Sequence, residues 1–212
     1  MEVFVDHSKL NESFDGTRTV QDAVRVVQEH ACSPGRLVVR LQFDGQDIKA
    51  EGMTAALQCD ASALTRLDVF TASRGELVID TMNQASLSLQ ETEEGCHQAA
   101  EMLGQGKVQE GMDTLAECLR IWQQVHQAVI GSIEMLGLDI MEATFQDAPL
   151  LDAVTKPKAV LFQIRDALKV NDHVLLADLL EYELSDVTNQ WFSIIAHLRE
   201  EADSTNNSPS EA

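Results

Sequence analysis

Two different spacings of apolar residues divide this chain. Up to about residue 73, apolar and polar side chains alternate, which is typical of strands with one buried face. From Glu76 onward, apolar side chains recur every three or four residues, which is typical of amphipathic helices. The change of spacing predicts an α+β fold, with a sheet-containing domain over residues 1–73 and a helical domain over residues 74–201.

The first domain contains three strand-like segments and one helical segment. The strand-like segments are residues 1–5, with Val3 and Val5 on one face, residues 37–43, with Leu37, Val39, Leu41 and Phe43 on one face, and residues 64–70. Thr19 is a good helix N-cap, and Asp22 favours the first turn. The helical face that follows consists of Val20, Ala23, Val24 and Val27. A helix is therefore expected between the first and second segments.

Turn chemistry separates these segments. It occurs at residues 11–16, which contain Asp15-Gly16, at Ser33-Pro34-Gly35 and at Asp44-Gly45. A short second strand is expected beside the first of these turns.

The order strand, strand, helix, strand, strand resembles the ubiquitin-like β-grasp over residues 1 to about 71. The resemblance is best at residues 1–5, at residues 40–48, where Phe43-Asp44-Gly45 matches the family's F-x-G, and at residues 64–70. It implies a β-grasp fold with a recognition patch on one face of the sheet. Many unrelated proteins adopt this fold, so it does not by itself imply a function.

The residues of that patch depart from the family. Gln42 stands where the family has an exposed central isoleucine, Phe70 occupies a neighbouring patch position, and Asp68 replaces the histidine beside it. No Gly-Gly pair follows the last strand, so the resemblance does not imply conjugation. Phe4, Gln42 and Phe70 remain candidates for binding a partner, and the alternative is that this face packs on the helical domain.

About four long helices in an antiparallel bundle are predicted for the second domain. The apolar positions of the first two are Val78, Met82, Ala85, Leu89, Thr92, Cys96, Ala99 and Leu103, then Val108, Met112, Leu115, Leu119, Trp122, His126, Val129, Ile133 and Leu136. Gly104-Gln105-Gly106 ends the first helix and Gly137 the second. The short connection between them predicts antiparallel neighbours.

The second half of this domain begins at Asp147-Ala148-Pro149, a good helix start. Pro157 should kink or split the next helix, and Asn171-Asp172 should turn the chain. The last helix carries Leu176, Leu180, Leu184, Val187, Trp191, Ile194 and Leu198. Trp122 and Trp191 are further partner-binding candidates, and residues 202–212 are expected to form a disordered polar tail.

The charge of the chain limits the classes of partner that we expect it to bind. The net charge is −20, and residues 74–212 carry 24 acidic and 8 basic side chains. Nucleic acids and anionic membranes bind clustered Lys and Arg, so neither is an expected partner. The acidic surface suggests a basic protein partner, with simple solubility as the alternative.

Other sequence features favour a cytoplasmic protein. Four cysteines, Cys32, Cys59, Cys96 and Cys118, form no CxxC pair and are expected to be thiols in a reducing compartment. No apolar run reaches transmembrane length, and Glu2 and Asp6 lie where a signal peptide would carry basic residues.

The chain offers little that indicates catalysis. Glu94-x-x-His97 has a spacing found in di-iron bundles, but Gln123-x-x-His126 lacks the second carboxylate. Glu94, His97 and His126 are thus weak candidates for metal ligands. Asp178, Glu181 and Glu183 cluster near Tyr182, and acid–base work there would need a cleft. No nucleophile or nucleotide-binding motif is present, so no catalytic residue and no cofactor is predicted.

The sequence therefore predicts a non-enzymatic cytoplasmic protein for protein interaction or scaffolding. Self-association through the long helices is plausible, because heptad-like seams pair between chains as well as within one. Two alternatives stay open: an acidic helical chaperone for flagellar or secretion substrates, and a metal-dependent enzyme with its site among the helices.

Overall fold

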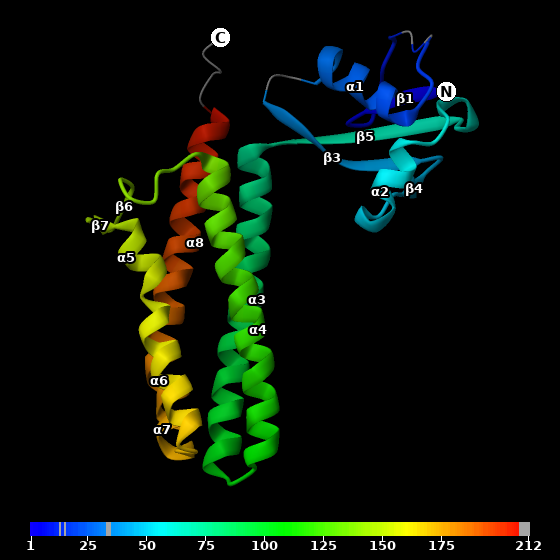
Figure 1. The fold of residues 1–212 in the computed structure, drawn as a ribbon. Coiled ribbons are helices and arrows are strands. Elements are labelled where there is room, and N and C mark those ends of the chain that lie inside the picture. Colours follow the sequence, from blue (N-terminus) through cyan, green and yellow to red (C-terminus); the bar gives the residue numbers. More distant parts are fainter. Residues whose placement is uncertain (13, 15, 33–34, 208–212) are drawn as a thin grey trace. The chain divides into compact units, whose positions relative to one another are not determined.

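The computed structural model describes residues 1–12, 14, 16–32 and 35–207. The described chain forms two compact units, Met1–Arg74 and the residues from Gly75 onward. The first contains a mixed sheet with helices and the second is almost entirely helical (Figure 1). The fold class is therefore α+β, as the change of apolar spacing predicted. Among the described residues, no helix combines the length and apolar character needed to cross a bilayer.

The described residues of the first unit form one five-stranded sheet in the order β2-β1-β5-β3-β4. The strands are β1 (Glu2–Val5), β2 (Ser8–Lys9), β3 (Arg36–Phe43), β4 (Gln46–Asp47) and β5 (Arg66–Ser73). β1 lies parallel to β5, and the other neighbouring strands are antiparallel. β1 and β5, the first and last strands of this unit, thus lie side by side in the interior of the sheet.

Two tight hairpins shape the sheet. Asp6 and His7, both with positive φ, join β1 to β2, so the second strand comes earlier than the turn expected at residues 11–16. Of that turn, residues 13 and 15 lie outside the described residues. Asp44 and Gly45, with φ of 49° and 83°, join β3 to β4 as predicted. The two-residue hairpin needs left-handed backbone, which Asp and Gly adopt readily.

Helix α1 (Val20–His30) covers one face of this sheet. The Thr19 hydroxyl accepts a hydrogen bond from the Asp22 backbone at 3.2 Å, and the Asp22 carboxylate accepts one from the Thr19 backbone at 3.2 Å. This reciprocal capping box confirms the predicted helix start. The apolar face packs on the sheet to form the core, which contains Val20, Ala23, Val24 and Val27 with Val3, Leu41, Leu67 and Val69. Of the predicted helix stop, Ser33 and Pro34 lie outside the described residues.

A β-bulge in β3 makes part of the predicted alternation wrong. Val38 pairs with Thr71 and Arg40 pairs with Phe70, which leaves Val39 as the extra residue. A one-residue shift reverses the faces on which side chains lie. Leu41 is therefore buried as predicted, whereas Leu37 and Val39 are each 43% exposed.

Residues 50–63 contain elements that the sequence patterns did not indicate. They form the short helix α2 (Ala50–Leu57) and a 3₁₀ turn over Ala61–Ala63. Among the described side chains of α2, Ala56 is buried, and Met53 and Leu57 are partly buried against the core. Such a short, weakly amphipathic helix has too few core contacts to produce a clear periodic pattern.

Helix α3 (Arg74–Gly104) begins directly after β5, without an intervening loop residue. Helix α4 (Val108–Leu136) returns beside it, antiparallel (Figure 1). Every apolar position predicted for α3 is buried, from Val78 to Leu103. The helices approach closely at glycines: a Cβ atom at Gly95 would lie 2.7 Å from the Cys118 sulfur.

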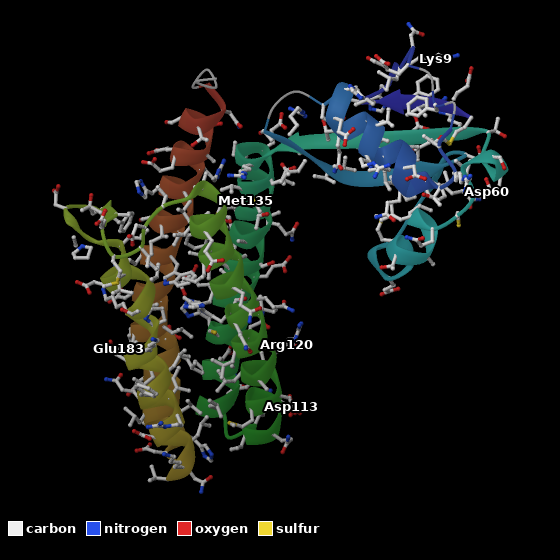
Figure 2. The ribbon with its side chains drawn as sticks, turned by 45° about the horizontal axis from the view of Figure 1, so that its top comes forward. Lys9, Asp60, Asp113, Arg120, Met135 and Glu183 are labelled. Atoms are coloured by element: carbon white, nitrogen blue, oxygen red, sulfur yellow. The ribbon has the colours of Figure 1, made fainter. Side chains whose placement is uncertain are left out.

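The buried face of α4 is rotated from the predicted one. Cys118 and Val125 are buried, while the predicted positions Leu119 and His126 are only partly buried. Figure 2 shows Asp113 and Arg120 on the exposed side of this helix. The rotation leaves an apolar stripe at the edge of the α4 contact surface.

The connection after α4 forms a small hairpin. Gly137 closes α4 in the left-handed conformation, as predicted. The hairpin consists of β6 (Thr144–Phe145) and β7 (Ala148–Pro149), joined by Gln146 and Asp147, which both have positive φ. Helix α5 (Leu150–Thr155) follows immediately, and α6 (Pro157–Lys169) starts at the proline. Pro157 therefore splits the helix, as expected.

The last helical segment has three parts. Asp172 caps α7 (His173–Asp178), a π-helical turn covers Leu179–Glu183, and α8 (Leu184–Asn207) completes the chain that the structure describes. Every apolar position predicted for this segment is buried. The tail expected from residue 202 is wrong for residues 202–207, because α8 continues and Ala202 is fully buried. Residues 208–212 lie outside the described residues.

Candidate functional site

The sheet brings three predicted partner-binding residues to one face. Phe4 on β1 and Gln42 on β3 both pair with Asp68 on β5, and Phe70 is two residues further along β5. The neighbouring positions in each strand are buried under α1, so these side chains lie on the opposite face. We call this surface, formed by Phe4, Arg40, Gln42, Arg66, Asp68 and Phe70, the open sheet face.

Each phenylalanine of the open sheet face lies beneath an arginine. The Arg66 guanidinium carbon is 3.9 Å from the centre of the Phe4 ring, and the Arg40 carbon is 3.9 Å from that of Phe70. The His7 ring meets Phe70 edge-on, with ring centres 5.2 Å apart. Both phenylalanines are partly exposed. A guanidinium over a ring is a favourable cation–π arrangement that fixes both side chains.

Carboxylates hold the two arginines in place. Arg66 donates two hydrogen bonds to Asp68, at 2.7 and 2.6 Å, and Asp68 is 4% exposed. The hydrogen bonds from Arg66 hold the pKa of the Asp68 carboxyl below its usual range. Arg40 lies 3.8 Å from Asp47, which accepts a hydrogen bond from Gln42 at 2.9 Å. Each arginine of the open sheet face therefore lies beside a carboxylate, Asp68 for Arg66 and Asp47 for Arg40.

The sequence could have indicated these arginines. Arg66, Asp68 and Phe70 alternate along β5, so a period of two places all three on one face. Arg40 is harder to place, because it follows the bulge in β3.

His97 has a different partner from the one its motif suggested. Its Nδ1 lies 3.3 Å from the Glu181 carboxylate, in a groove of about 540 Å³ that Tyr182 also lines. Glu94 is exposed and does not line this groove. Among the described residues, no group of three or more His, Cys, Asp or Glu side chains is arranged to hold a metal ion. Glu94, His97 and His126 are thus not brought together.

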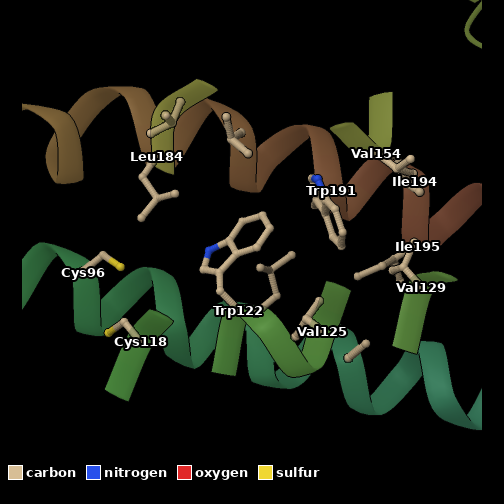
Figure 3. Packing of buried hydrophobic residues seen from close by; sticks show 14 of the residues in the cluster. Cys96, Cys118, Trp122, Val125, Val129, Val154, Leu184, Trp191, Ile194 and Ile195 are labelled. Atoms are coloured by element: carbon tan, nitrogen blue, oxygen red, sulfur yellow. The ribbon is translucent and has the colours of Figure 1, made fainter. Parts of the chain in front are cut away.

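Trp122 and Trp191 belong to the helical core. Their ring centres are 4.9 Å apart in a T-shaped contact between α4 and α8 (Figure 3). They are 4% and 0% exposed, so neither presents a surface to a partner, and that expectation was wrong for both. His126 stacks on Trp191 with ring centres 5.4 Å apart. Burial, assisted by Lys158, lowers the pKa of His126, which favours a neutral imidazole.

Comparison with known proteins places the helical unit in a family. No curated protein and no solved structure matches the chain. A family model described as a domain of unknown function, DUF8042, matches residues 80–194, which is more than half of the chain. The match begins within α3 and ends within α8, so it includes both tryptophans and the His97–Glu181 pair but none of the five-stranded sheet. The chain therefore belongs to the DUF8042 family.

Proposed function

We propose that the protein is a non-enzymatic protein-interaction or scaffolding protein that binds a partner through the open sheet face. The observation that carries the proposal is the pair of partly exposed phenylalanines, Phe4 and Phe70, each beneath an arginine. Aromatic residues and arginine are over-represented among the side chains that dominate protein interfaces. The face is thus equipped to bind another protein.

The arrangement of these side chains favours binding. Asp68 holds Arg66 with two hydrogen bonds, and Gln42 helps to position Asp47 beside Arg40. Side chains that are already ordered lose less conformational entropy when a partner binds. Both arginine side chains also remain about half exposed, so a partner can contact them beside the rings.

We propose further that the first unit is a ubiquitin-like β-grasp and the second an antiparallel four-helix bundle. The strand order β2-β1-β5-β3-β4, with β1 parallel to β5 and α1 on one face, supports the first assignment. The packing of α3, α4, α5–α6 and α7–α8 around one apolar cluster supports the second. In this proposal the bundle is a cytoplasmic scaffold whose acidic surface suits a basic partner or a second copy of the chain.

Site-specific photocrosslinking in the native host tests the proposed function. A photoreactive phenylalanine analogue replaces Phe70 in one variant and the exposed Leu87 of α3 in a control. We expect a discrete crosslinked protein at position 70 that is absent at position 87. An Arg40→Ala substitution should weaken the crosslink, because it removes the cation over the neighbouring ring. Equal crosslinking at the two positions, or none at position 70, would contradict the proposal.

A second candidate function is that of an acidic chaperone. Five large apolar side chains are exposed on the segment that runs from α6 through the π-helical turn: Phe162, Val170, Val174, Leu175 and Tyr182. Exposed apolar side chains suit transient binding of unfolded or exported chains, and residues 74–212 as a whole are acidic. A chaperone should slow the aggregation of a model substrate, and Val174→Asp should abolish that effect. An unchanged aggregation rate with the wild-type protein would contradict this function.

A further inference from the structure

A cavity of about 400 Å³ lies in the helical unit, between α4 and the α5–α6 pair. Its walls come from Leu119, Trp122, Gln123 and His126 of α4 and from Val154, Pro157, Lys158 and Leu161 of α5 and α6. The volume falls within the range of about 300–1,000 Å³ that is typical of small-molecule sites.

The cavity results from the rotation of α4 and the break at Pro157. Leu119 and His126 lie on the stripe that the sequence predicts to be core, yet both remain partly exposed. The ring of Trp122 packs inward against Trp191. Across the cavity, α6 begins at Pro157 and offers Leu161 to this stripe. Apolar side chains that the rest of the chain leaves partly exposed therefore line both walls of the cavity, on α4 and on α6.

Polar groups gather at this otherwise apolar cavity. Lys158 is exposed, and its side chain makes no ion pair or hydrogen bond within the described part of the chain. The side chains of His126 and Gln123 make no hydrogen bond to another described residue either. The positive charge is notable, because residues 74–212 carry 24 acidic and only 8 basic side chains. The Gln123 amide, the His126 imidazole and the Lys158 ammonium group thus border an apolar space.

We propose that this cavity binds a small amphiphilic carboxylate, whose apolar body contacts Leu119, Trp122 and Leu161 and whose carboxylate pairs with Lys158. An unpaired ammonium group and a neutral imidazole both donate hydrogen bonds to a carboxylate. The apolar walls exclude a strongly hydrated ligand, since burial of polar groups without partners is unfavourable. A hydrocarbon or aromatic body with a single acidic head satisfies both parts of the site.

Titration of the full chain with matched eight-carbon compounds tests this proposal. Octanoate, octanol and octylamine each have eight carbon atoms and differ in the head group. Because the carboxyl carbon is one of the eight, octanol and octylamine have the longer alkyl chain, so chain length does not favour octanoate. The protein contains two tryptophans, and Trp122 lines the cavity, so intrinsic fluorescence should report binding alongside calorimetry. We expect octanoate to bind saturably and more tightly than octanol, and octylamine to bind most weakly. Each added methylene from hexanoate to decanoate should lower the dissociation constant roughly fourfold.

Substitutions locate the ligand. Lys158→Gln should weaken octanoate binding roughly three- to tenfold and leave octanol binding unchanged. Lys169→Gln is the matched control, because Lys169 lies on the same helix but pairs with Asp166 at 3.2 Å. Leu161→Trp should fill the cavity and remove binding of all the probes, provided that its thermal unfolding shows a folded protein.

Three results would overturn the proposal. The first is the absence of saturable binding by any carboxylate of the series. The second is equal affinity for octanoate and octylamine, which would show that the site does not select an anion. The third is octanoate binding that neither Lys158→Gln nor a folded Leu161→Trp variant changes, which would place the ligand elsewhere. None of these results depends on whether the open sheet face binds a partner.

Discussion

At the scale of single residues, the helical core contains two tryptophans whose indole nitrogens are buried without a hydrogen-bond partner among the described residues. These residues are Trp122 and Trp191, and both side chains are buried. A buried donor without a partner is destabilising, whereas the ring itself contributes much apolar contact. The packing of the rings and the unpaired donors therefore act on stability in opposite directions.

Two substitutions at Trp191 separate these effects. Trp191→Ala should lower the free energy of unfolding by about 3–5 kcal/mol, because it empties a large buried site. Trp191→Phe should lower it much less, since it keeps an aromatic ring and removes the unpaired N–H. Urea denaturation measures both, with Tyr182→Phe at an exposed site as the control. Equal losses for Ala and Phe would contradict this separation, because the ring that Phe retains would then contribute nothing to stability.

His126 should make stability depend on pH. Burial lowers its pKa from the ordinary value of 6.5, so the unfolded chain takes up a proton more readily than the folded one. Stability should then be greatest above about pH 6.5 and should fall as the pH drops through this value. We expect His126→Gln to lose less thermal stability than the wild type between about pH 7.5 and pH 5.5. An identical loss in both proteins would assign the acid sensitivity to other groups.

The cysteines should differ in reactivity. Cys59 is exposed, Cys32 is partly buried with its thiol pKa raised by burial, and Cys96 and Cys118 are buried. Titration with a thiol reagent should give a fast phase from Cys59, a slower phase from Cys32, and two thiols, Cys96 and Cys118, that react only on unfolding. Cys59→Ser should remove the fast phase. A fast phase that persists in this variant would show that another thiol becomes accessible.

At the scale of elements, local chemistry and periodic burial were predictable. The Thr19–Asp22 capping box, the Asp44-Gly45 turn and the stop at Gly137 use side chains only a few residues apart. The buried faces of α3 and α8 follow directly from helical spacing. The bulge in β3 and the rotation of α4 were not predictable in this way, because each depends on a neighbouring element.

The bulge leads to a direct test on β3. Leu41→Ala should lower the free energy of unfolding of the sheet by about 2–5 kcal/mol, because Leu41 is 2% exposed. Val39→Thr should change it by less than about 0.5 kcal/mol, because Val39 is half exposed. Chemical denaturation measures both variants. A large loss for Val39→Thr would contradict the position of the bulge.

At the scale of the whole molecule, the dominant property is a net charge of −20. Repulsion among excess acidic groups opposes the compact state, and salt screens it. We therefore expect the melting temperature to rise as sodium chloride increases from about 0.01 M to about 0.3 M. A thermal shift series measures this change, with a neutral osmolyte as the control for non-ionic effects. A melting temperature that falls with salt would indicate that ion pairs outweigh the repulsion.

The sequence by itself determined the α+β class, the change from sheet to helices near residue 74, and most helix ends and apolar faces. These features depend on residues within a few turns of one another. Tertiary structure decided that Arg66 lies over Phe4 and Arg40 over Phe70, and that Trp122 and Trp191 are buried. It also paired His97 with Glu181, 84 residues away, instead of Glu94. Contacts between distant segments depend on strand register and helix rotation, and apolar spacing alone specifies neither.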